Sequence, residues 1–279
     1  MTPRIAVTGS TGHVGGEVAR LLSAAGYEQK LIVRDPARAP GLPGTSTAQA
    51  DYADRQSSLD ALRGSEVLFM VSGAEAEDRV DQHRNFIDAA AEAGVQHIVY
   101  TSFLAAAPDA TFTLGRDHWA TEEHIRNSGM DYTFLRDNFY LDVLPLFAGE
   151  EGILRGPAGD GRVSAVARTD VARTAVVVVL KDPQAHAGKS YDLTGPEALS
   201  LSEVAAVITR VTGRETRYEE ETVEEAYASR ASYGAPDWQL DAWVSTYTAI
   251  ASGQLERTTT AVQDLTGAKP ISLEELLRR

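Results

Sequence analysis

A glycine-rich segment near the start of the chain constrains the fold more than any other feature. It reads Gly9-Ser10-Thr11-Gly12-His13-Val14-Gly15, follows the apolar run Ile5 to Thr8, and opens a stretch with apolar residues at helical spacing. Gly9 permits a tight turn, Gly12 lets the backbone approach a pyrophosphate, and Gly15 lets a helix pack closely on a strand. The free N–H groups of a helix N-terminus favour a bound phosphate. Residues 9–15 are therefore predicted to bind a dinucleotide, and the alternative is a glycine-rich turn with a structural role only.

Short β-rich runs alternate with helical stretches along the N-terminal half of the chain. Six strands are predicted: Ile5 to Thr8, Leu31 to Val33, Thr47 to Ala50, Val67 to Val71, Ile98 to Thr101 and Tyr132 to Leu135. Two of the intervening helices are expected to end at Gly26 and Gly94. This alternation predicts an α/β fold with a Rossmann-type doubly wound parallel sheet.

The pattern loosens after Asp137, where glycine and proline crowd a stretch of longer loops. Helical segments are predicted from Asp170 to Leu180, after the capping-box sequence Ser200-Leu201-Ser202-Glu203, and from Asp237 to Ala251. We expect a dinucleotide-binding Rossmann domain over residues 1–136 and a smaller C-terminal α/β substrate-covering region over residues 137–279. The second part is expected to be interleaved with the sheet rather than independent. It is well placed to wall a substrate pocket, because ligands bind beyond the carboxyl ends of strands in open α/β sheets.

The composition argues against several classes of partner. The 279 residues have a formal net charge of -14 and include only four lysines, so no basic surface for nucleic acid is expected. The lack of cysteine, and of histidine pairs at ligand spacing, argues against disulfides and metal binding. No apolar run has the length of a membrane span and no signal-peptide pattern is present, so a cytoplasmic protein is predicted. A small molecule is the expected partner, and a homo-oligomer is left open.

The end of the second strand indicates which dinucleotide binds. NAD-binding proteins place an acidic side chain there on the ribose 2′-hydroxyl, whereas NADP-binding proteins place a cation. Here the strand ends in Val33-Arg34-Asp35, and Arg34 is suited to a 2′-phosphate, with Arg38 in support. Asp35 could instead face the ribose, or cap the turn before Pro36. The prediction is therefore NADP(H).

Four residues at later strand ends are expected beside the ribose and nicotinamide of the dinucleotide. They are Ser72, Gly73, Thr101 and Ser102. Their positions favour contact because the carboxyl ends of parallel strands meet at one edge of the sheet. A serine at such a place could instead cap a turn.

Several segments together show a family resemblance. They are Val33 to Pro36, Thr101-Ser102, His118 to Glu122, Ser128 to Arg136, Arg168 to Ala172 and Leu193 to Pro196. Together with the glycine-rich turn, they resemble the NmrA-like atypical short-chain dehydrogenase/reductases, in particular the quinone oxidoreductase branch, over nearly the whole chain. The resemblance implies an NADPH-dependent reductase. It also implies an adenine contact for Asp51, with an Asx turn as the alternative, and acceptor contacts for Asp137, Asn138 and Phe139.

Two departures from the related patterns affect the chemistry. The quinone oxidoreductase pattern has asparagine where this chain has Asp137. The Tyr-x-x-x-Lys pair of the wider superfamily is absent, because none of the four lysines follows a tyrosine at that spacing. Tyr132-x-x-x-Arg136 has a similar spacing, but in a predicted strand the two side chains share one face for packing reasons.

The absent Tyr-x-x-x-Lys pair bears on the kind of acceptor. Reducing an isolated ketone generates an alkoxide whose conjugate acid has a pKa of about 16, close to that of water. The oxyanion of a reduced quinone is phenol-like, with a conjugate-acid pKa of about 10, and needs no strong proton donor. We therefore expect hydride transfer to a quinone or another conjugated carbonyl. The candidate proton donors are His118, near the end of a loop after the fifth strand, and Tyr140, just after the sixth. Either residue could instead only shape the pocket.

Two other functions remain open at this level. One is a tailoring-pathway ketoreductase in which His118 or Tyr140 replaces the lost tyrosine. The other is a redox sensor that binds NADP(H) without turnover. The aromatic residues Trp238, Trp243 and Tyr247 are expected to pack in the core, and the alternative is that they line a pocket for an aromatic acceptor.

The cofactor prediction can be tested at Arg34. Arg34→Glu should weaken binding of NADPH far more than of NADH, because a charge-assisted hydrogen bond contributes about 1.5–3 kcal/mol. That energy corresponds to roughly 10- to 150-fold in affinity, measured by titration of both cofactors. An equal loss for NADPH and NADH would contradict the assignment of Arg34 to a 2′-phosphate.

Overall fold

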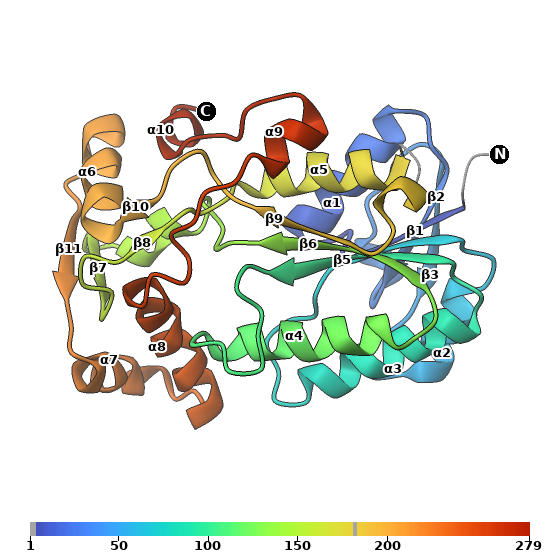
Figure 1. The fold of residues 1–279 in the computed structure, drawn as a ribbon, viewed down its shortest axis with the longest axis horizontal. Coiled ribbons are helices and arrows are strands. Elements are labelled where there is room, and N and C mark those ends of the chain that lie inside the picture. The colour runs from blue at the N-terminus through green and yellow to red at the C-terminus, as the bar shows by residue number, and fades with distance from the viewer. Residues whose placement is uncertain (1–3, 181–182) are drawn as a thin grey trace. The chain divides into compact units, whose positions relative to one another are not determined.

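A seven-stranded sheet is the largest element of the structure, a computed structural model that describes residues 4–180 and 183–279. The strand order is β3-β2-β1-β4-β5-β6-β9 (Figure 1). The strands are Ile5–Thr8 (β1), Gln29–Val33 (β2), Thr45–Gln49 (β3), Val67–Met70 (β4), His97–Phe103 (β5), Asp131–Asp137 (β6) and Lys189–Leu193 (β9). β1 pairs in parallel with β2 and β4, β2 with β3, and β4 with β5. Along the chain, strands are added first to one side of β1 (β2, β3) and then to its other side (β4 onward), as in a doubly wound sheet. The predicted fold class is therefore confirmed.

Helices cover both faces of this sheet. They are α1 (His13–Ala24), α2 (Arg55–Leu62), α3 (Arg79–Glu92), α4 (Thr113–Arg126) and α5 (Arg168–Leu180). α1 and α5 lie on one face, and α2, α3 and α4 lie on the other (Figure 1). Because both faces are covered, every residue of β1, β4 and β5 is buried. That is why β1 and β4 read as uninterrupted apolar runs.

The predicted strands all appear in the sheet, with bounds that differ by a few residues. The seventh strand, β9, was not predicted, because its sequence is mostly polar and only Leu193 of it is buried. The placement of His118 near the end of a loop is wrong, since α4 begins at Thr113. α4 contains few apolar residues and one glycine, Gly115, so its helical period is weak in the sequence.

The chain divides into two compact units. The first contains most of the sheet and consists of the described residues up to Ser102, Asp117–Arg136 and Val171–Tyr191. The second consists of Phe103–Arg116, Asp137–Asp170 and Asp192–Arg279. The assignment of residues 1–136 to cofactor binding and of residues 137–279 to covering the substrate stays a prediction about function.

Short strands and helices make up the second unit. β7 (Ile153–Gly156) pairs in parallel with β11 (Arg217–Glu220), and β8 (Arg162–Val163) pairs antiparallel with β10 (Leu199–Ser200). The helices of its C-terminal part are α6 (Leu201–Thr212), α7 (Val223–Arg230), α8 (Asp237–Ala251), α9 (Ala261–Thr266) and α10 (Leu273–Leu277). The chain also has 3-10 turns at Pro36–Arg38 (η1), Leu144–Ala148 (η2), Pro183–His186 (η3) and Ala231–Tyr233 (η4). The predicted capping box is confirmed, because Ser200 Oγ accepts the Glu203 N–H and the Glu203 carboxylate accepts the Ser200 N–H.

The helices are too short or too polar to span a membrane within the part of the chain that the structure describes. Crossing a bilayer takes about 20 consecutive, mainly apolar residues. Within residues 4–180 and 183–279, none of the helices combines sufficient length with sufficient apolar character.

Glu122 on α4 is a buried carboxylate that joins three elements of the first unit. Its oxygens accept hydrogen bonds from Ser102 Oγ on β5 at 2.6 Å and from Arg136 Nη2 on β6 at 2.6 Å. Arg126, one turn along α4, adds a third donor at 2.9 Å. The carboxylate is 0% exposed, and the two arginines supply the charge that makes its burial tolerable.

We expect Glu122→Ala to lower the free energy of unfolding by about 3 kcal/mol, because it leaves two arginines without their shared partner. The control is Glu123→Ala, which removes a half-exposed carboxylate paired with Arg126. Surface ion pairs contribute about 1 kcal/mol or less, so this control should stay near the parent. Urea denaturation measures both, and equal losses would contradict the assigned role of Glu122.

Candidate functional site

The glycine-rich turn has the geometry that its sequence predicts. Gly9 has a φ of 64°, in the left-handed region, and its carbonyl accepts the Gly12 N–H at 2.9 Å. A Cβ on Gly15 would lie 2.5 Å from the Thr8 carbonyl oxygen and closer still to that of Gly9. The same atom on Gly12 would meet only the Gly9 oxygen, at 3.3 Å. Gly15 is therefore required by packing, whereas Gly12 is open on its outer side.

The end of α1 that follows this turn fits a phosphate group. Gly12 is the N-cap of α1 and provides no side-chain hydrogen bond to the first turn. Thr11, Gly12 and His13 are exposed, whereas the side chain of Val14 is buried. Ser10 Oγ is buried and has no hydrogen-bond partner among the described residues. Uncapped N–H groups beside an unpartnered hydroxyl suit an anionic ligand such as a pyrophosphate.

Two arginines that follow β2, Arg34 and Arg38, are exposed. Arg34 is exposed, and its guanidinium makes no ion pair with any residue that the structure describes. Asp35 caps η1, where its carboxylate accepts the Ala37 N–H at 3.0 Å. The alternative of a capping role for Asp35 is therefore the one observed. Asp51 likewise forms an Asx turn, accepting the Ala53 N–H at 3.0 Å, so its predicted adenine contact stays a prediction.

Side chains fix the loop that follows β4. The Ser72 N–H donates to Thr101 Oγ1 at 2.8 Å, and the Gly73 N–H donates to His83 Nε2 at 2.8 Å. Ser102 donates to Glu122, so its hydroxyl is committed within the first unit. These bonds hold the carboxyl ends of β4 and β5 in register, where the ribose and nicotinamide are predicted to lie.

Two polar residues of α3 that sequence reasoning missed support this loop. Arg79 Nε donates to the Gly73 carbonyl at 3.0 Å and its Nη1 lies 3.3 Å from the Asp117 carboxylate. The His83 imidazole donates from Nδ1 to Thr121 Oγ1, because the threonine proton is used on the Asp117 carbonyl. Burial, with Arg79 nearby, lowers the pKa of His83 to about 3, so it is neutral. The spacing of one helical turn between Arg79 and His83 was the available signal.

His118 belongs to the same buried network. Arg79 Nη2 donates to His118 Nε2 at 3.2 Å, which places the imidazole proton on Nδ1, beside the Tyr100 hydroxyl at 3.0 Å. Burial, then the charge of Arg79, lowers the pKa of His118 well below its usual value. Both nitrogens of a neutral His118 are thus engaged inside the first unit. The prediction that it donates a proton to an acceptor finds no support in this geometry.

The residues after β6 lie in the second unit. Asn138 is buried, and its amide donates to Ser164 Oγ and to the Leu255 carbonyl, both at 2.9 Å, while its oxygen accepts the Phe139 N–H. Its predicted acceptor contact would compete with these bonds. Phe139 packs against two other phenylalanines, with ring centroids 5.1 Å apart. Tyr140 donates its hydroxyl proton to the Asp137 carboxyl group at 3.0 Å.

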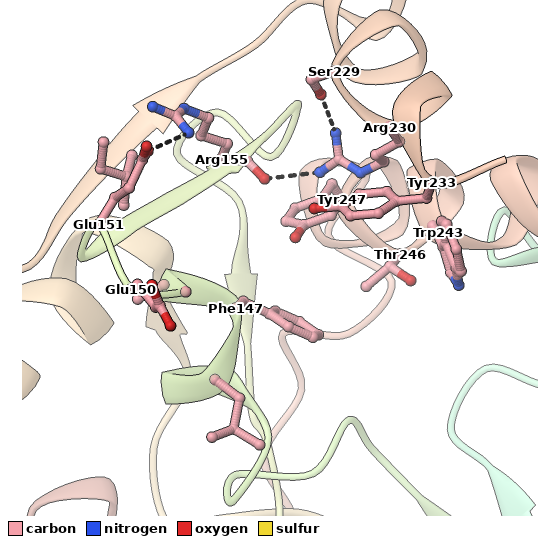
Figure 2. A pocket seen from close by; sticks show the side chains of 14 residues that line it. Phe147, Glu150, Glu151, Arg155, Ser229, Arg230, Tyr233, Trp243, Thr246 and Tyr247 are labelled. Atoms are coloured by element: carbon pink, nitrogen blue, oxygen red, sulfur yellow. Dashed lines mark hydrogen bonds and ion pairs between the residues drawn. The ribbon is translucent and has the colours of Figure 1, made fainter. Parts of the chain in front are cut away.

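A ring-lined pocket of about 670 Å³ opens in the second unit between η2, β7, α7 and α8 (Figure 2). The rings of Tyr233 and Trp243 meet edge to face with their centroids 5.9 Å apart, and the ring centroids of Phe147 and Tyr247 are 6.1 Å apart. The Arg230 guanidinium stacks over Tyr247 at 5.0 Å. Tyr247 belongs to the hydrophobic core and also lines the pocket. Core packing and a place in an aromatic pocket are therefore compatible for this residue. The volume is that of a small-molecule site, and the rings suit a flat aromatic molecule.

The turn, sheet order and strand-end geometry define a dinucleotide-binding α/β protein. A model of the NmrA-like family matches residues 1–265, and the chain belongs to this family. It is 34% identical to quinone oxidoreductase 2 of Escherichia coli, covering 97% of this chain and 96% of that protein. It is also 34% identical to an NAD(P)H azoreductase of Xenophilus azovorans, over 94% and 93% of the two chains.

Solved structures show the same likeness. The NADPH complex of an E. coli NADPH-dependent quinone oxidoreductase superposes with a TM-score of 0.87 at 34% identity, over 98% of each chain. The predicted resemblance is therefore confirmed over nearly the whole chain.

The contrast between Gly12 and Gly15 gives a test of the turn. Gly12→Val should abolish dinucleotide binding and leave the melting temperature near that of the parent, because its side chain would occupy the phosphate side of the turn. Gly15→Ala should instead lower stability, by about 1–3 kcal/mol, since its Cβ would overlap two carbonyl oxygens. Calorimetric titration and thermal melting separate the two effects. Normal NADPH binding by Gly12→Val would place the cofactor elsewhere.

Proposed function

We propose that this chain is an NADPH-dependent reductase that transfers hydride to a quinone or another conjugated carbonyl compound. The observation that supports the acceptor class most directly is the environment of Tyr140, shortly after β6. Tyr140 hydrogen-bonds to a carboxyl group and has no lysine at the spacing of the short-chain dehydrogenase pair. A tyrosine without the lysine of that pair suits a phenol-like product better than an alkoxide.

The coarser part of this function does not depend on the acceptor. The chain is an oxidoreductase that uses NADP(H), in line with its relatives. Residues 9–15 would hold the pyrophosphate, and Arg34 would pair with the 2′-phosphate. When bound, the cofactor supplies the hydride, and the protein supplies its orientation and a site from which water is excluded.

The pocket in the second unit suits an aromatic molecule, and Tyr140 is not among the residues that line it. Its rings come from η2, η4 and α8, and its arginines are already paired, Arg230 with Glu221 at 2.9 Å and Arg155 with Glu151 at 3.0 Å. A pocket with matched charges and several rings favours a neutral flat molecule over an anion. Two relatives are named for quinones and for azo compounds.

A panel of acceptors tests the proposal. Oxidation of NADPH should be measurable with small quinones and weak with unactivated ketones. With quinones, Tyr140→Phe should cost less than about 10²-fold in turnover, the lower end of acid catalysis, because the product oxyanion is weakly basic. Turnover of ketones but not quinones, with a loss of about 10³-fold in Tyr140→Phe, would indicate the ketoreductase. Tight NADPH binding without oxidation by any acceptor would indicate the sensor.

A further inference from the structure

Asp137 is a buried carboxyl group at the end of β6 that hydride transfer alone does not require. It is 3% exposed. Its Oδ2 accepts the Tyr140 hydroxyl at 3.0 Å, and its Oδ1 has no hydrogen-bond partner among the described residues. Its backbone carbonyl accepts the Leu104 N–H at 2.7 Å, which fixes the position of the residue. A buried carboxylate normally needs a cation or several hydrogen-bond donors. Among the described residues, the side chain of Asp137 has one donor, the Tyr140 hydroxyl.

The charged groups around this pair are already matched with other partners. Arg168 lies 6.0 Å from the centre of the Tyr140 ring, and both its backbone N–H and its guanidinium face the Asp142 carboxylate. Arg136, the preceding residue of β6, is bound to Glu122. Burial outweighs the single bond from Tyr140 and raises the pKa of Asp137 well above its usual range. The neutral carboxylic acid is therefore the favoured form.

We propose that Asp137 and Tyr140 form a proton relay, in which Tyr140 protonates the oxygen of the reduced acceptor and Asp137 returns a proton to Tyr140. The inference rests on the proposed function, because it needs an acceptor oxygen. Tyr140 is the catalytic residue, and Asp137 is a positioning residue that acts through it. Asparagine, which the related pattern has at this position, could hold the tyrosine but has no proton to give.

The proton and electron movements balance. As the hydride from NADPH adds to carbon, the carbonyl π pair becomes a lone pair on the acceptor oxygen, and NADPH is oxidised to NADP⁺. That oxygen takes the phenolic proton of Tyr140. This transfer requires the neutral Asp137 to carry its proton on Oδ2, so that the carboxyl group donates across the 3.0 Å hydrogen bond and the phenolic proton is left for the acceptor. The phenolate then takes that carboxyl proton. The Asp137 carboxylate then takes a proton from water, which restores the pair for another turnover.

The relay should matter most for conjugated carbonyls whose reduced oxyanion is more basic than that of a quinone. With an enone such as cyclohexenone, Tyr140→Phe should lower kcat by about 10²-fold or more. Asp137→Asn should lower kcat about 10-fold with little change in KM, because the tyrosine keeps its place and its own first proton. The fall of kcat at high pH, as Asp137 loses its proton, should be absent in Asp137→Asn. The control Asp131→Asn changes an exposed aspartate at the other end of β6 and should keep the parent profile.

A second measurement is independent of turnover. Infrared spectra of the cofactor-free protein at neutral pH should show the carbonyl stretch of a protonated carboxylic acid, lost in Asp137→Asn and kept in Asp131→Asn. Absence of that band, or identical pH profiles for the parent and Asp137→Asn, overturns the relay. If the band is present but the parent reduces no acceptor, the proposed function fails and the relay step fails with it. If quinones are reduced and the band is absent, the relay alone is wrong.

Discussion

The approach of Gly15 to the carbonyl oxygens of Thr8 and Gly9 is the constraint on which the cofactor side of the structure depends. It allows α1 to start directly at the end of β1. The first turn of that helix therefore lies at the carboxyl edge of the sheet, and no side chain caps its N–H groups. A larger residue at position 15 would move α1 away and separate its N–H groups from the strand ends. The absence of a Cβ at Gly15 thus determines where an anion can bind.

Burial sets the ionisation of the polar groups that support the two candidate sites. In the first unit, His83 and His118 are neutral because they are buried beside Arg79. Their proton positions follow from their hydrogen-bond partners, so they hold the loop after β4 without adding charge near a negatively charged ligand. In the second unit the same physical effect acts on an acid, Asp137, and keeps its proton on. Burial without a matched charge disfavours the charged form of each group, so it lowers the pKa of the histidines and raises the pKa of the aspartate.

The sequence was sufficient for features with a strong local signal. The turn, the buried strands, the capping box of α6 and the bounds of α8 followed from glycine spacing, apolar runs and helix signals. It was insufficient for β9 and α4, whose polar composition hides their period. The roles of Arg79 and His118 also could not be predicted, because they arise from contacts between helices distant in the chain. Sequence position alone could not distinguish a histidine open to a ligand from one enclosed by an arginine and a tyrosine.

The division of the chain into its two units has a consequence for how such a protein can change over time. The backbone passes from one unit to the other after Ser102, Arg116, Arg136, Asp170 and Tyr191. A chain cut after Arg136 would therefore lose α5 and β9, an outer helix and an edge strand of the sheet. A single exchange point in the chain would interrupt both units, because each consists of three separate stretches. Substitutions within single loops and helices, by contrast, leave all five crossings between the units in place.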